Sequence, residues 1–449
     1  MINGVLLTAS ALMLFATLDT RTWRDPDLDR FVVLWIVAVA AWPSLVTYLI
    51  APLVWTSADQ SGSLFPAIQY SPALLMSCLA FWRALRDRRA ELSVPALLIG
   101  SLLLFSAAGF LTGAGPKAVN LTVAAGMFLG VVLRPRRVTV RSVGVGSVAA
   151  ICVLTIAIAI ATTVNAGATL ESCRIDKCNI LGESLTSPFA GNGNSLGLAV
   201  VLLTPFALAV CSPIRVVATV AGVAAIQEVA TSRTAIIGFA AAVATVLLVR
   251  LIDSGRAKTL IGCLSLATAL AVSLFPLYGK FSGSAYSFRG YLWEAAERLI
   301  TDAPIFGHGA TYWTVMGESA LFDANYSPHN GWFDIVVALG MWGAGIVVIG
   351  VYVHVRSTSA ESRPFVCAYY ACVLGVSAFE SVYVPFYLGI TPFAAILPLI
   401  LYDPAPSAAS GLAPAAWYPD DQDVDKEADR TDSTKRSGDM RTQRHTERL

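Results

Sequence analysis

Residues 142–165 read SVGVGSVAAICVLTIAIAIATTVN, a stretch without a charged side chain that follows Arg134, Arg136, Arg137 and Arg141. A run of this length and apolarity matches an α-helix that crosses about 30 Å of hydrocarbon. The strands of a membrane barrel would instead alternate apolar and polar residues. The stretch therefore predicts a membrane-spanning helix.

Stretches of the same kind recur along the whole chain. Thirteen of them lie near residues 2–18, 31–51, 65–82, 95–113, 117–133, 142–165, 194–211, 214–227, 233–251, 259–278, 331–354, 364–380 and 384–402. Because 214–227 is short for a span, we expect about 12 or 13 membrane helices. The sequence thus predicts an all-α fold, a polytopic membrane helix bundle.

The composition agrees with this fold class. Of the 449 residues, 56% are hydrophobic and 14% are charged, and the mean hydropathy is +0.65. A soluble domain carries about 25% charged residues. These values exclude a soluble enzyme, a disordered chain, a nucleic-acid-binding domain and a secreted disulfide scaffold, and they make the lipid bilayer the expected surrounding.

The distribution of basic residues predicts the orientation. Alternate loops carry 17 of the 31 Lys and Arg residues, the opposite loops carry 7, and the last 7 lie after residue 402. By the positive-inside rule, the first set of loops faces the cytoplasm. We therefore expect two long loops, 166–193 and 279–330, on the outer side, and a disordered cytoplasmic tail. The predicted units are N-terminal membrane helices in 1–165, a second membrane domain in 166–402 and the tail in 403–449.

Two of the eight cysteines differ from the others in their position. Cys173 and Cys178 share the outer loop 166–193, whereas the other six lie in or beside apolar spans, where a thiol acts as a small apolar side chain. In an oxidising outer compartment the pair predicts a disulfide. A metal site needs more ligands than this loop offers, so we expect no metal there.

Four polar clusters share one placement, at the start of a predicted helix on the outer side. They are Asn192–Ser195, Thr231–Thr234, Ser287–Arg289 and Ser327–Asn330. Backbone N–H groups and the positive end of the helix dipole favour anions at such starts. Arg233 and Arg289 add guanidinium groups that suit phosphate oxygens, and His329 adds an imidazole that can act as acid or base. The residues by themselves predict an outward-facing site for an anion or a phospholipid.

The third cluster opens an amphipathic segment, residues 287–304. Its apolar residues fall on one stripe and its charged residues on the other, which predicts a helix on the membrane surface or over the bundle. Ser287 is the expected N-cap, and Pro304 ends the pattern.

Each candidate residue also has an ordinary structural interpretation. Arg233 could be a membrane anchor, and Arg289 could pair with carboxylates of its own helix. His329 could cap the following helix, and His308 could be a turn residue.

The order of the motifs resembles that of the O-antigen ligase and O-antigen polymerase superfamily, which are bacterial membrane glycosyltransferases. The matching stretches are FAGNGNSLG at 189–197, SRTA at 232–235, RGYLW at 289–293 with PIFGHG at 304–309, and His329-Asn330 followed by GMWG at 340–343. The resemblance covers about residues 185–350. In the first motif this family often has His-Pro-Asn, whereas here Gly193 precedes Asn194, so no histidine function carries over to that position.

The resemblance implies a type C glycosyltransferase architecture in the bacterial cytoplasmic membrane, with the active site facing outward. It implies a glycan donor carried on undecaprenyl diphosphate and a metal-independent, inverting transfer without a cofactor. Arg233 and Arg289 would hold the diphosphate, and His329 would help to activate the acceptor hydroxyl. The expected substrate-binding residues are Asn194, Ser232, Trp293, His308 and Asn330.

Two activities within the superfamily remain open. A ligase attaches the finished glycan to an acceptor such as lipid A core or another surface acceptor, whereas a polymerase extends the glycan or exopolysaccharide itself. A different class, a flippase or transporter of lipid-linked oligosaccharides, would place charged residues inside the spans. The spans are nearly free of them, and Glu228 and Glu380 lie at span ends.

Overall fold

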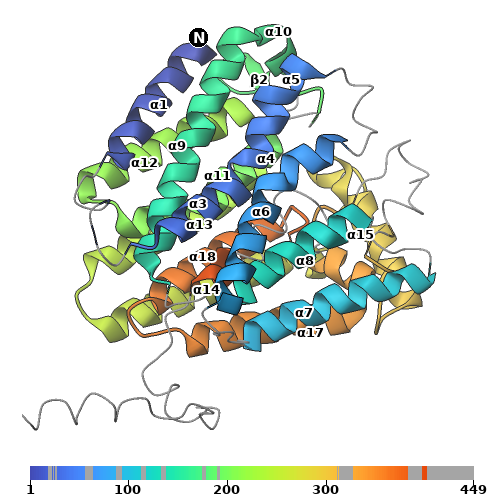
Figure 1. Ribbon diagram of the computed structural model, residues 1–449. Helices are drawn as coiled ribbons and strands as arrows, with labels where there is room; N and C mark the ends of the chain where they lie inside the picture. The colour runs from blue at the N-terminus through green and yellow to red at the C-terminus, as the bar shows by residue number, and fades with distance from the viewer. Residues whose placement is uncertain are drawn as a thin grey trace, which may run out of the picture. The chain divides into compact units, whose positions relative to one another are not determined.

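The structure is a computed structural model that divides into a unit Met1–Ala405 and a unit Pro406–Leu449. It describes residues 1–18, 23, 25, 28–55, 64–86, 94–112, 118–132, 138–173, 178–189, 193–310, 312, 327–382 and 397–401. All of these residues belong to the first unit (Figure 1). The predicted tail 403–449 lies outside the described residues, as does most of the span predicted near 384–402.

The N-terminal part consists of helices. They are α1 Ile2–Thr17, α3 Arg30–Ala40, α4 Trp42–Leu45, the π-helix η1 Val46–Ile50, α5 Ala51–Val54, α6 Leu64–Arg86, α7 Val94–Ala108, the 3₁₀-helix η3 Gly109–Thr112, α8 Ala118–Val132 and α9 Val140–Val164.

The remaining part adds one short β-hairpin to further helices. Its elements are α10 Ala166–Thr169, β1 Leu170–Ser172, β2 Glu183–Leu185, α11 Asn194–Val210, α12 Pro213–Ala230, α13 Arg233–Leu251, α14 Gly255–Tyr278, α15 Ala285–Asp302, α17 Gly331–Ser357 and α18 Arg363–Ser377.

The helices confirm the predicted all-α membrane bundle. Every predicted span up to 364–380 coincides with a helix, and 214–227, the shortest, lies within α12. Among the described residues, seven helical segments are long and apolar enough to cross a membrane: Arg30–Val54, Leu64–Arg83, Val140–Val164, Pro213–Ala230, Arg233–Leu251, Gly255–Tyr278 and Gly331–Ser357. Three further apolar helices are shorter: Ile2–Thr17, Leu97–Ala108 and Asn194–Val210.

Polar side chains define several helix starts. The Asp29 carboxylate accepts hydrogen bonds from Phe31 N and Val32 N, and Thr139 Oγ1 accepts one from Ser142 N. Such caps satisfy backbone N–H groups that have no partner within the helix. These caps fix the first residues of α3 and α9, next to the charged loops that precede them.

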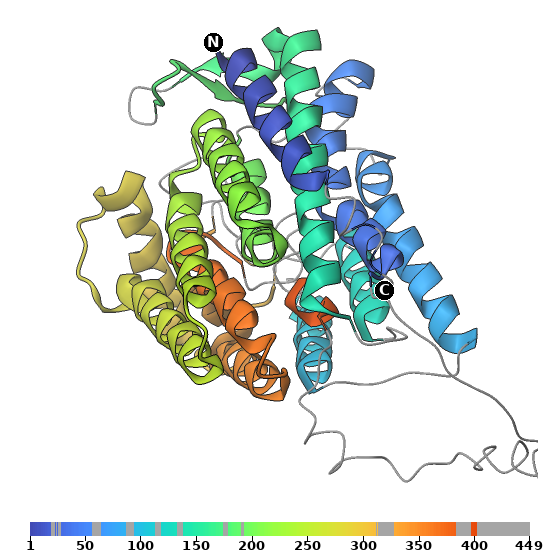
Figure 2. The same ribbon diagram turned by 90° about the vertical axis from the view of Figure 1, so that its left-hand side faces the viewer.

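Small residues allow the central helices to approach closely. Helix α9 packs against α1, α3 and α11, an arrangement visible in Figures 1 and 2. A Cβ atom on Gly144 would lie 2.6 Å from the Phe206 carbonyl oxygen, and one on Gly238 would lie 2.9 Å from that of Cys372. Close contact through small residues is how helices associate in lipid, where apolar burial gives little drive.

Contacts between helix ends agree with the alternation of sides that the basic residues predict. Asp25 forms an ion pair with Arg141, and Arg215 Nη2 donates to the Leu18 carbonyl oxygen at 3.5 Å. On the opposite side, Asn165 Nδ2 donates to Pro52 O at 3.4 Å. Each contact joins two loops that were assigned to the same side.

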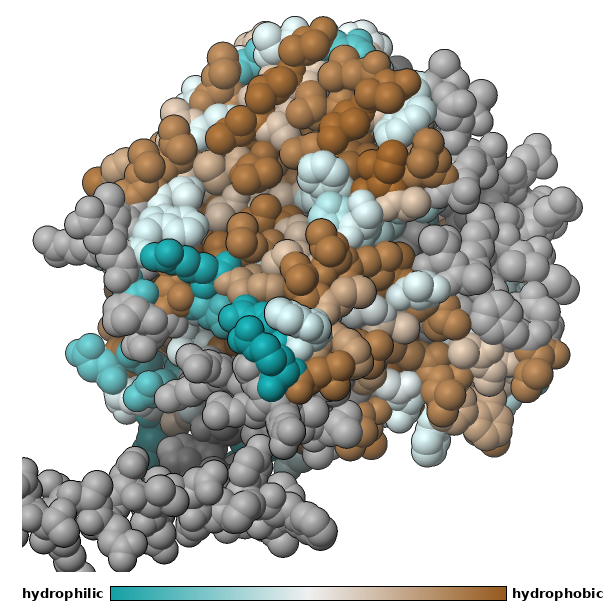
Figure 3. Space-filling model, viewed as in Figure 1, coloured by the Kyte–Doolittle hydropathy of each residue, from teal (hydrophilic) through white to brown (hydrophobic). Residues whose placement is uncertain are grey.

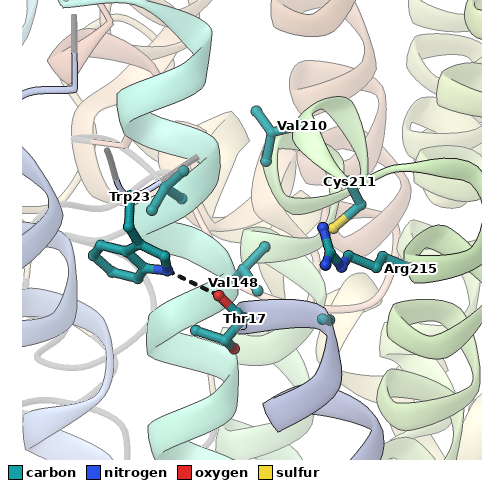
Figure 4. Close-up of a pocket in the computed structure, with 8 residues that line it drawn as sticks. Thr17, Trp23, Val148, Val210, Cys211 and Arg215 are labelled. Atoms are coloured by element: carbon teal, nitrogen blue, oxygen red, sulfur yellow. Dashed lines mark hydrogen bonds between the residues drawn. The ribbon is translucent and has the colours of Figure 1, made fainter. Parts of the chain in front are cut away.

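The end of the bundle with Asp25 and Arg141 holds a small pocket. Figure 4 shows this pocket, with Trp23, Cys211 and Arg215 around it, and Trp23 Nε1 donates to Thr17 O at 2.8 Å. The cavity volume is about 20 Å³, enough for roughly one water molecule. This pocket is too small to hold a substrate.

The outer surface of the helices is apolar. Leu34, Leu104 and Leu251 are more than half exposed, and the face that carries α1 and α9 is mostly hydrophobic in Figure 3. Continuous apolar surface of this extent is unfavourable in water and is typical of contact with lipid. The chain is a multi-pass membrane protein.

The predicted outer loop 166–193 is fastened to the bundle. Strands β1 and β2 pair antiparallel, and a disulfide joins Cys173 to Cys178 beyond them. Asn179 Nδ2 donates to Glu228 O at 2.9 Å, and Ile180 N donates to Glu228 Oε1 at 2.9 Å. The loop is thereby held at the end of α12, directly before the turn that leads into α13.

Two of the motifs contact each other at a kink in α17. Gly340 has φ 66° and ψ −169°, and a Cβ atom there would overlap the Ile305 carbonyl group. Met341 N donates to Pro304 O at 2.9 Å, and His308 N donates to Val337 O at 2.8 Å. The PIFGHG and GMWG stretches therefore form one packed unit in which only glycine fits at position 340.

Candidate active site

The side chain of Glu380 is the centre of a polar cluster. Glu380 lies just beyond α18, and its side chain is only 10% exposed. Its Oε1 atom accepts hydrogen bonds from Asn194 Nδ2 at 2.9 Å, Thr234 Oγ1 at 3.2 Å and Arg289 Nη2 at 3.3 Å. Its Oε2 atom lies 3.4 Å from His329 Nδ1. One carboxylate thus connects four segments of the chain.

The partners of Glu380 come from the clusters that the sequence placed at helix starts. Asn194 begins α11, Thr234 lies in the first turn of α13, and His329 directly precedes α17. Arg289 is the first residue of α15 after three residues with non-helical backbone angles. Asn194, Arg289 and His329 therefore meet at Glu380, whereas the expected convergence of Arg233 with Arg289 and His329 on one diphosphate stays a prediction.

The environment of Glu380 favours its charged form. Burial by itself would raise the pKa of the carboxyl, but the hydrogen bond and charge of His329, the charge of Arg289 and the hydrogen bond from Asn194 lower it below its usual value. The positive ends of the α11 and α13 dipoles act in the same direction. The cluster therefore holds a buried carboxylate together with a guanidinium group.

The pKa of the Arg289 guanidinium is also lowered, which for this group disfavours the charged form. Burial lowers the pKa of its guanidinium group, and the charge of Glu380 partly offsets this effect. A guanidinium remains charged in proteins even so. The group also lies 5.8 Å from the ring centroid of Phe379, within the range of a cation–π contact.

Asn194 links two parts of the cluster. Its Oδ1 atom accepts hydrogen bonds from Ser232 Oγ at 2.5 Å and from Thr234 Oγ1 at 3.4 Å, while its Nδ2 atom donates to Glu380. A Cβ atom on Gly197, one turn along α11, would meet Ser232 Cβ at 2.5 Å. The close approach of α11 to the start of α13 therefore depends on glycine at position 197.

Unusual backbone conformations flank the cluster. Thr231 and His329 both have φ 49°, in the left-handed region that non-glycine residues rarely adopt. Tyr286, Ser287 and Phe288 form a left-handed turn directly before Arg289. Strained backbone of this kind persists where the surrounding structure enforces it, and it concentrates at functional sites.

The structure gives the helix predicted at 287–304 a different beginning. Helix α15 extends over Ala285–Asp302, and its regular part starts only after Phe288. The Tyr286 ring packs against the rings of Phe281, Trp293 and Phe379, with centroids 5.3–5.6 Å apart. This aromatic packing holds the left-handed turn that aims Arg289 at Glu380.

Trp293 and Asn330 lie inside the structure beneath the cluster. Trp293 is 2% exposed, and its Nε1 atom donates to Pro328 O at 3.0 Å. Asn330 is fully buried and caps α17, because its Oδ1 atom accepts hydrogen bonds from Trp332 N and Phe333 N. Both residues position the segment around His329 through packing and backbone contacts.

Two predicted residues lie away from Glu380. His308 Nε2 is 2.8 Å from Leu299 O, and its ring lies 4.7 Å from that of Tyr312, in the unit formed by the PIFGHG and GMWG stretches. Arg233 is exposed at the start of α13, between Ser232 and Thr234, which both belong to the cluster network.

Glu380 is the residue that sequence reasoning missed. Its only signal is a single carboxylate at the end of an apolar stretch, where it lies 186 residues after Asn194. A charged group beside a membrane span is costly unless it is paired, which is the physical reason to look for a partner.

A larger apolar cavity lies between α7, α14, α17 and α18. Its volume is about 380 Å³. Trp332 and Val382, which line it, lie within three residues of His329 and Glu380 along the chain. In the part of the chain that the structure describes, no group of three or more His, Cys, Asp or Glu side chains is placed to hold a metal ion.

The fold and the site define a multi-pass helical membrane protein with a buried ionic cluster where several helices begin. Residues 217–348 match the family described as O-Antigen ligase, which supports the resemblance over the motifs from SRTA at 232–235 to GMWG at 340–343. The matched stretch contains Arg233, Arg289 and His329, whereas Asn194 and Glu380 lie outside it. No curated protein and no solved structure matches the chain.

Proposed function

We propose that the chain is a glycosyltransferase that moves a glycan from undecaprenyl diphosphate to an acceptor hydroxyl at the outer face of the cytoplasmic membrane. The observation that carries this proposal is the contact of both Arg289 and His329 with Glu380. These two residues come from separate motifs, 40 positions apart, and have the chemistry that such a transfer needs.

In this proposal the diphosphate of the donor lies against Arg289 and Arg233. A guanidinium has five N–H donors, and the contact with Glu380 uses Nη2 of Arg289. Arg233, exposed at the start of α13, adds a second fork and the backbone donors of a helix N-terminus. The diphosphate is the leaving group, so these charges stabilise the negative charge that develops on it in the transition state.

His329 takes the proton of the acceptor hydroxyl. Its side chain is 30% exposed, so a substrate can reach it, although the residue is held by Glu380. A positioned base of this kind accelerates a reaction about 10²–10⁴-fold. The acceptor oxygen would attack the sugar from the face opposite to the diphosphate, which inverts the anomeric centre.

The surroundings of the cluster suit a lipid-linked donor. Such a donor joins a charged head to a long apolar chain, and the structure has both a polar cluster and an apolar cavity of about 380 Å³ whose lining includes Trp332 and Val382. The sequence also predicts that the cluster faces outward, since all its helix starts lie on the side with few basic residues.

A transfer assay with purified protein tests the proposal. The donor is an undecaprenyl-diphosphate glycan, and the acceptor is either lipid A core or a second glycan of the donor type. Transfer to lipid A core identifies a ligase, and elongation of the glycan identifies a polymerase. Unchanged rates in EDTA are expected for a metal-independent reaction.

Point variants separate the proposed roles. Arg233→Lys and Arg289→Lys keep the charge but lose the fork, so donor affinity and turnover should both fall. His329→Ala should keep donor affinity and lower turnover about 10²–10⁴-fold. Arg298→Lys is the matched control, because Arg298 is exposed and pairs with Glu294 at 2.9 Å on the surface of α15.

Two results would contradict these roles. Near-normal turnover in His329→Ala would remove the base assignment. Donor binding in both Lys variants as tight as in Arg298→Lys would remove the diphosphate assignment from Arg233 and Arg289.

A further inference from the structure

We propose that Glu380 is a positioning residue that fixes the tautomer of His329, with the proton on Nδ1 and the lone pair on Nε2. This inference rests on the proposed function, in which His329 acts as the base. It adds a residue outside the matched family stretch to the reaction, and it names the nitrogen that receives the proton.

The contact itself sets the direction of the hydrogen bond. Glu380 Oε2 lies 3.4 Å from His329 Nδ1. A carboxylate can only accept, so Nδ1 must carry the hydrogen, and a neutral imidazole then has its lone pair on Nε2. The bond is long, as catalytic hydrogen bonds often are before substrate binds.

The other carboxylate oxygen prevents Glu380 from turning away. Asn194, Thr234 and Arg289 all donate to Oε1, from three different helices. Because the carboxylate is fixed at Oε1, the direction of Oε2 is fixed too. The carboxylate can therefore hold the imidazole in one orientation.

Further side-chain bonds join the segment around His329 to the segment around Glu380. Ser327 Oγ and Ser381 Oγ are 2.9 Å apart, and Asn330 Nδ2 donates to Ala378 O at 3.0 Å. These contacts lie on either side of the His329–Glu380 contact along both segments. Together they hold His329 in its left-handed conformation, with φ 49°.

The reaction step balances with these groups alone. The acceptor oxygen forms a bond to the anomeric carbon, and the bond from that carbon to the diphosphate oxygen breaks, so that the diphosphate leaves with the electron pair. The hydroxyl proton moves to Nε2 of His329, and the resulting imidazolium is stabilised by the Glu380 carboxylate. The proton passes to water after the product leaves, and Glu380 remains a carboxylate throughout.

Glu380→Gln separates this role from that of a simple structural contact. The Gln amide can donate to Nδ1, which moves the ring hydrogen to Nε2 and removes the lone pair from the reacting side. Turnover should fall about 10²–10⁴-fold, the range for loss of a base. Glu380→Asp keeps the carboxylate on a shorter side chain, so it should retain the tautomer and lose less turnover than Gln.

The tautomer can be read directly by nitrogen NMR of histidine-labelled protein at pH 8.5. The chain has four histidines, so the His329 signals are assigned by their loss in His329→Gln. We expect the Nδ1–H form in the wild type and in Glu380→Asp, and the Nε2–H form in Glu380→Gln. Glu297→Gln is the matched control, because Glu297 is exposed on α15, and it should leave the tautomer unchanged.

The outcomes distinguish this inference from the proposed function. An Nε2–H form in the wild type, or an unchanged tautomer in folded Glu380→Gln, would overturn the role of Glu380. If Glu380→Gln does not fold, an Nε2–H form in Glu380→Asp would overturn it. A shift of the tautomer with full turnover would support the positioning by Glu380 and refute His329 as the base.

Discussion

Asn330 offers a strict test of how the structure holds His329. The sequence left Asn330 as a substrate-binding candidate, whereas in the structure its side chain makes four hydrogen bonds inside the protein. Oδ1 accepts from Trp332 N and Phe333 N, both at 3.0 Å, and Nδ2 donates to Ser273 O at 3.3 Å and to Ala378 O at 3.0 Å. The residue is fully buried.

The structure gives the size of the effect. In Asn330→Ala the loss of the cap should cost about 0.5–2 kcal/mol, and the two buried carbonyl groups that lose their donor should add about 1–3 kcal/mol. We expect a total loss of about 1.5–5 kcal/mol in the free energy of unfolding. Asn330→Ser keeps a cap oxygen and loses only the amide donors, so it should lose less, about 1–3 kcal/mol.

The assay is unfolding of the purified protein by SDS in mixed micelles, followed by circular dichroism. Asn3→Ala is the matched control, because in the described part of the chain the buried Oδ1 atom of Asn3 has no hydrogen-bond partner. Because this change breaks no hydrogen bond of that oxygen, it should not lower the free energy of unfolding by more than about 0.5 kcal/mol. If Asn330→Ala is as stable as Asn3→Ala but binds the donor poorly, the cap assignment is wrong and Asn330 is a substrate-binding residue.

The charges, the cysteines and Glu380 each give a further prediction. In a cysteine-free background, a cysteine at Ser319 should react with an impermeant maleimide on intact cells and one at Ser407 should not; the reverse pattern would overturn the orientation. Mass analysis of protein isolated without reductant should find Cys173 and Cys178 joined by a disulfide, and two free thiols would refute this pair. Removing the disulfide should lower the free energy of unfolding by at most about 2–3 kcal/mol, because the closed loop is short. The pKa of Glu380 is lower in the folded protein than its usual value of 4.5. The Glu380 carboxylate should therefore stabilise the folded protein fully above pH 4.5, and this stabilisation should be lost as the pH falls through the lower pKa of the folded state. Melting curves between pH 3 and 7 should show this loss of stability, and the loss should be smaller in Glu380→Gln.

The family motifs could be found from the sequence because each is local. The stretch at 232–235, the one at 289–293 and the pair at 329–330 each begin a helix, and helix starts share a recognisable chemistry of polar caps and anion-binding N–H groups. In the structure, Thr234, Arg289 and His329 from these stretches all contact the Glu380 carboxylate. Which residues contact substrate, however, is not a local property.

The roles of Trp293 and Asn330 show this limit. Both were expected to bind substrate, Trp293 because an aromatic ring can stack on a sugar and Asn330 because it belongs to the His329-Asn330 motif. The structure buries both and uses their polar atoms within the protein, on Pro328 and at the start of α17. Side-chain type does not indicate whether a residue points toward a cavity or into the packing of the helices.

The amino-acid sequence alone is enough to predict a bundle of membrane helices. The bilayer imposes a length and an apolarity on every span, and these requirements appear in consecutive residues such as 142–165. Only the tertiary structure selected Glu380 as the centre of the site. Its contacts with Asn194 and Arg289 join residues 186 and 91 positions apart, and no local pattern encodes such pairs. They exist because the packing of α11, α13, α15 and α17 brings the beginnings of these helices to the end of α18, where a buried carboxylate must find donors.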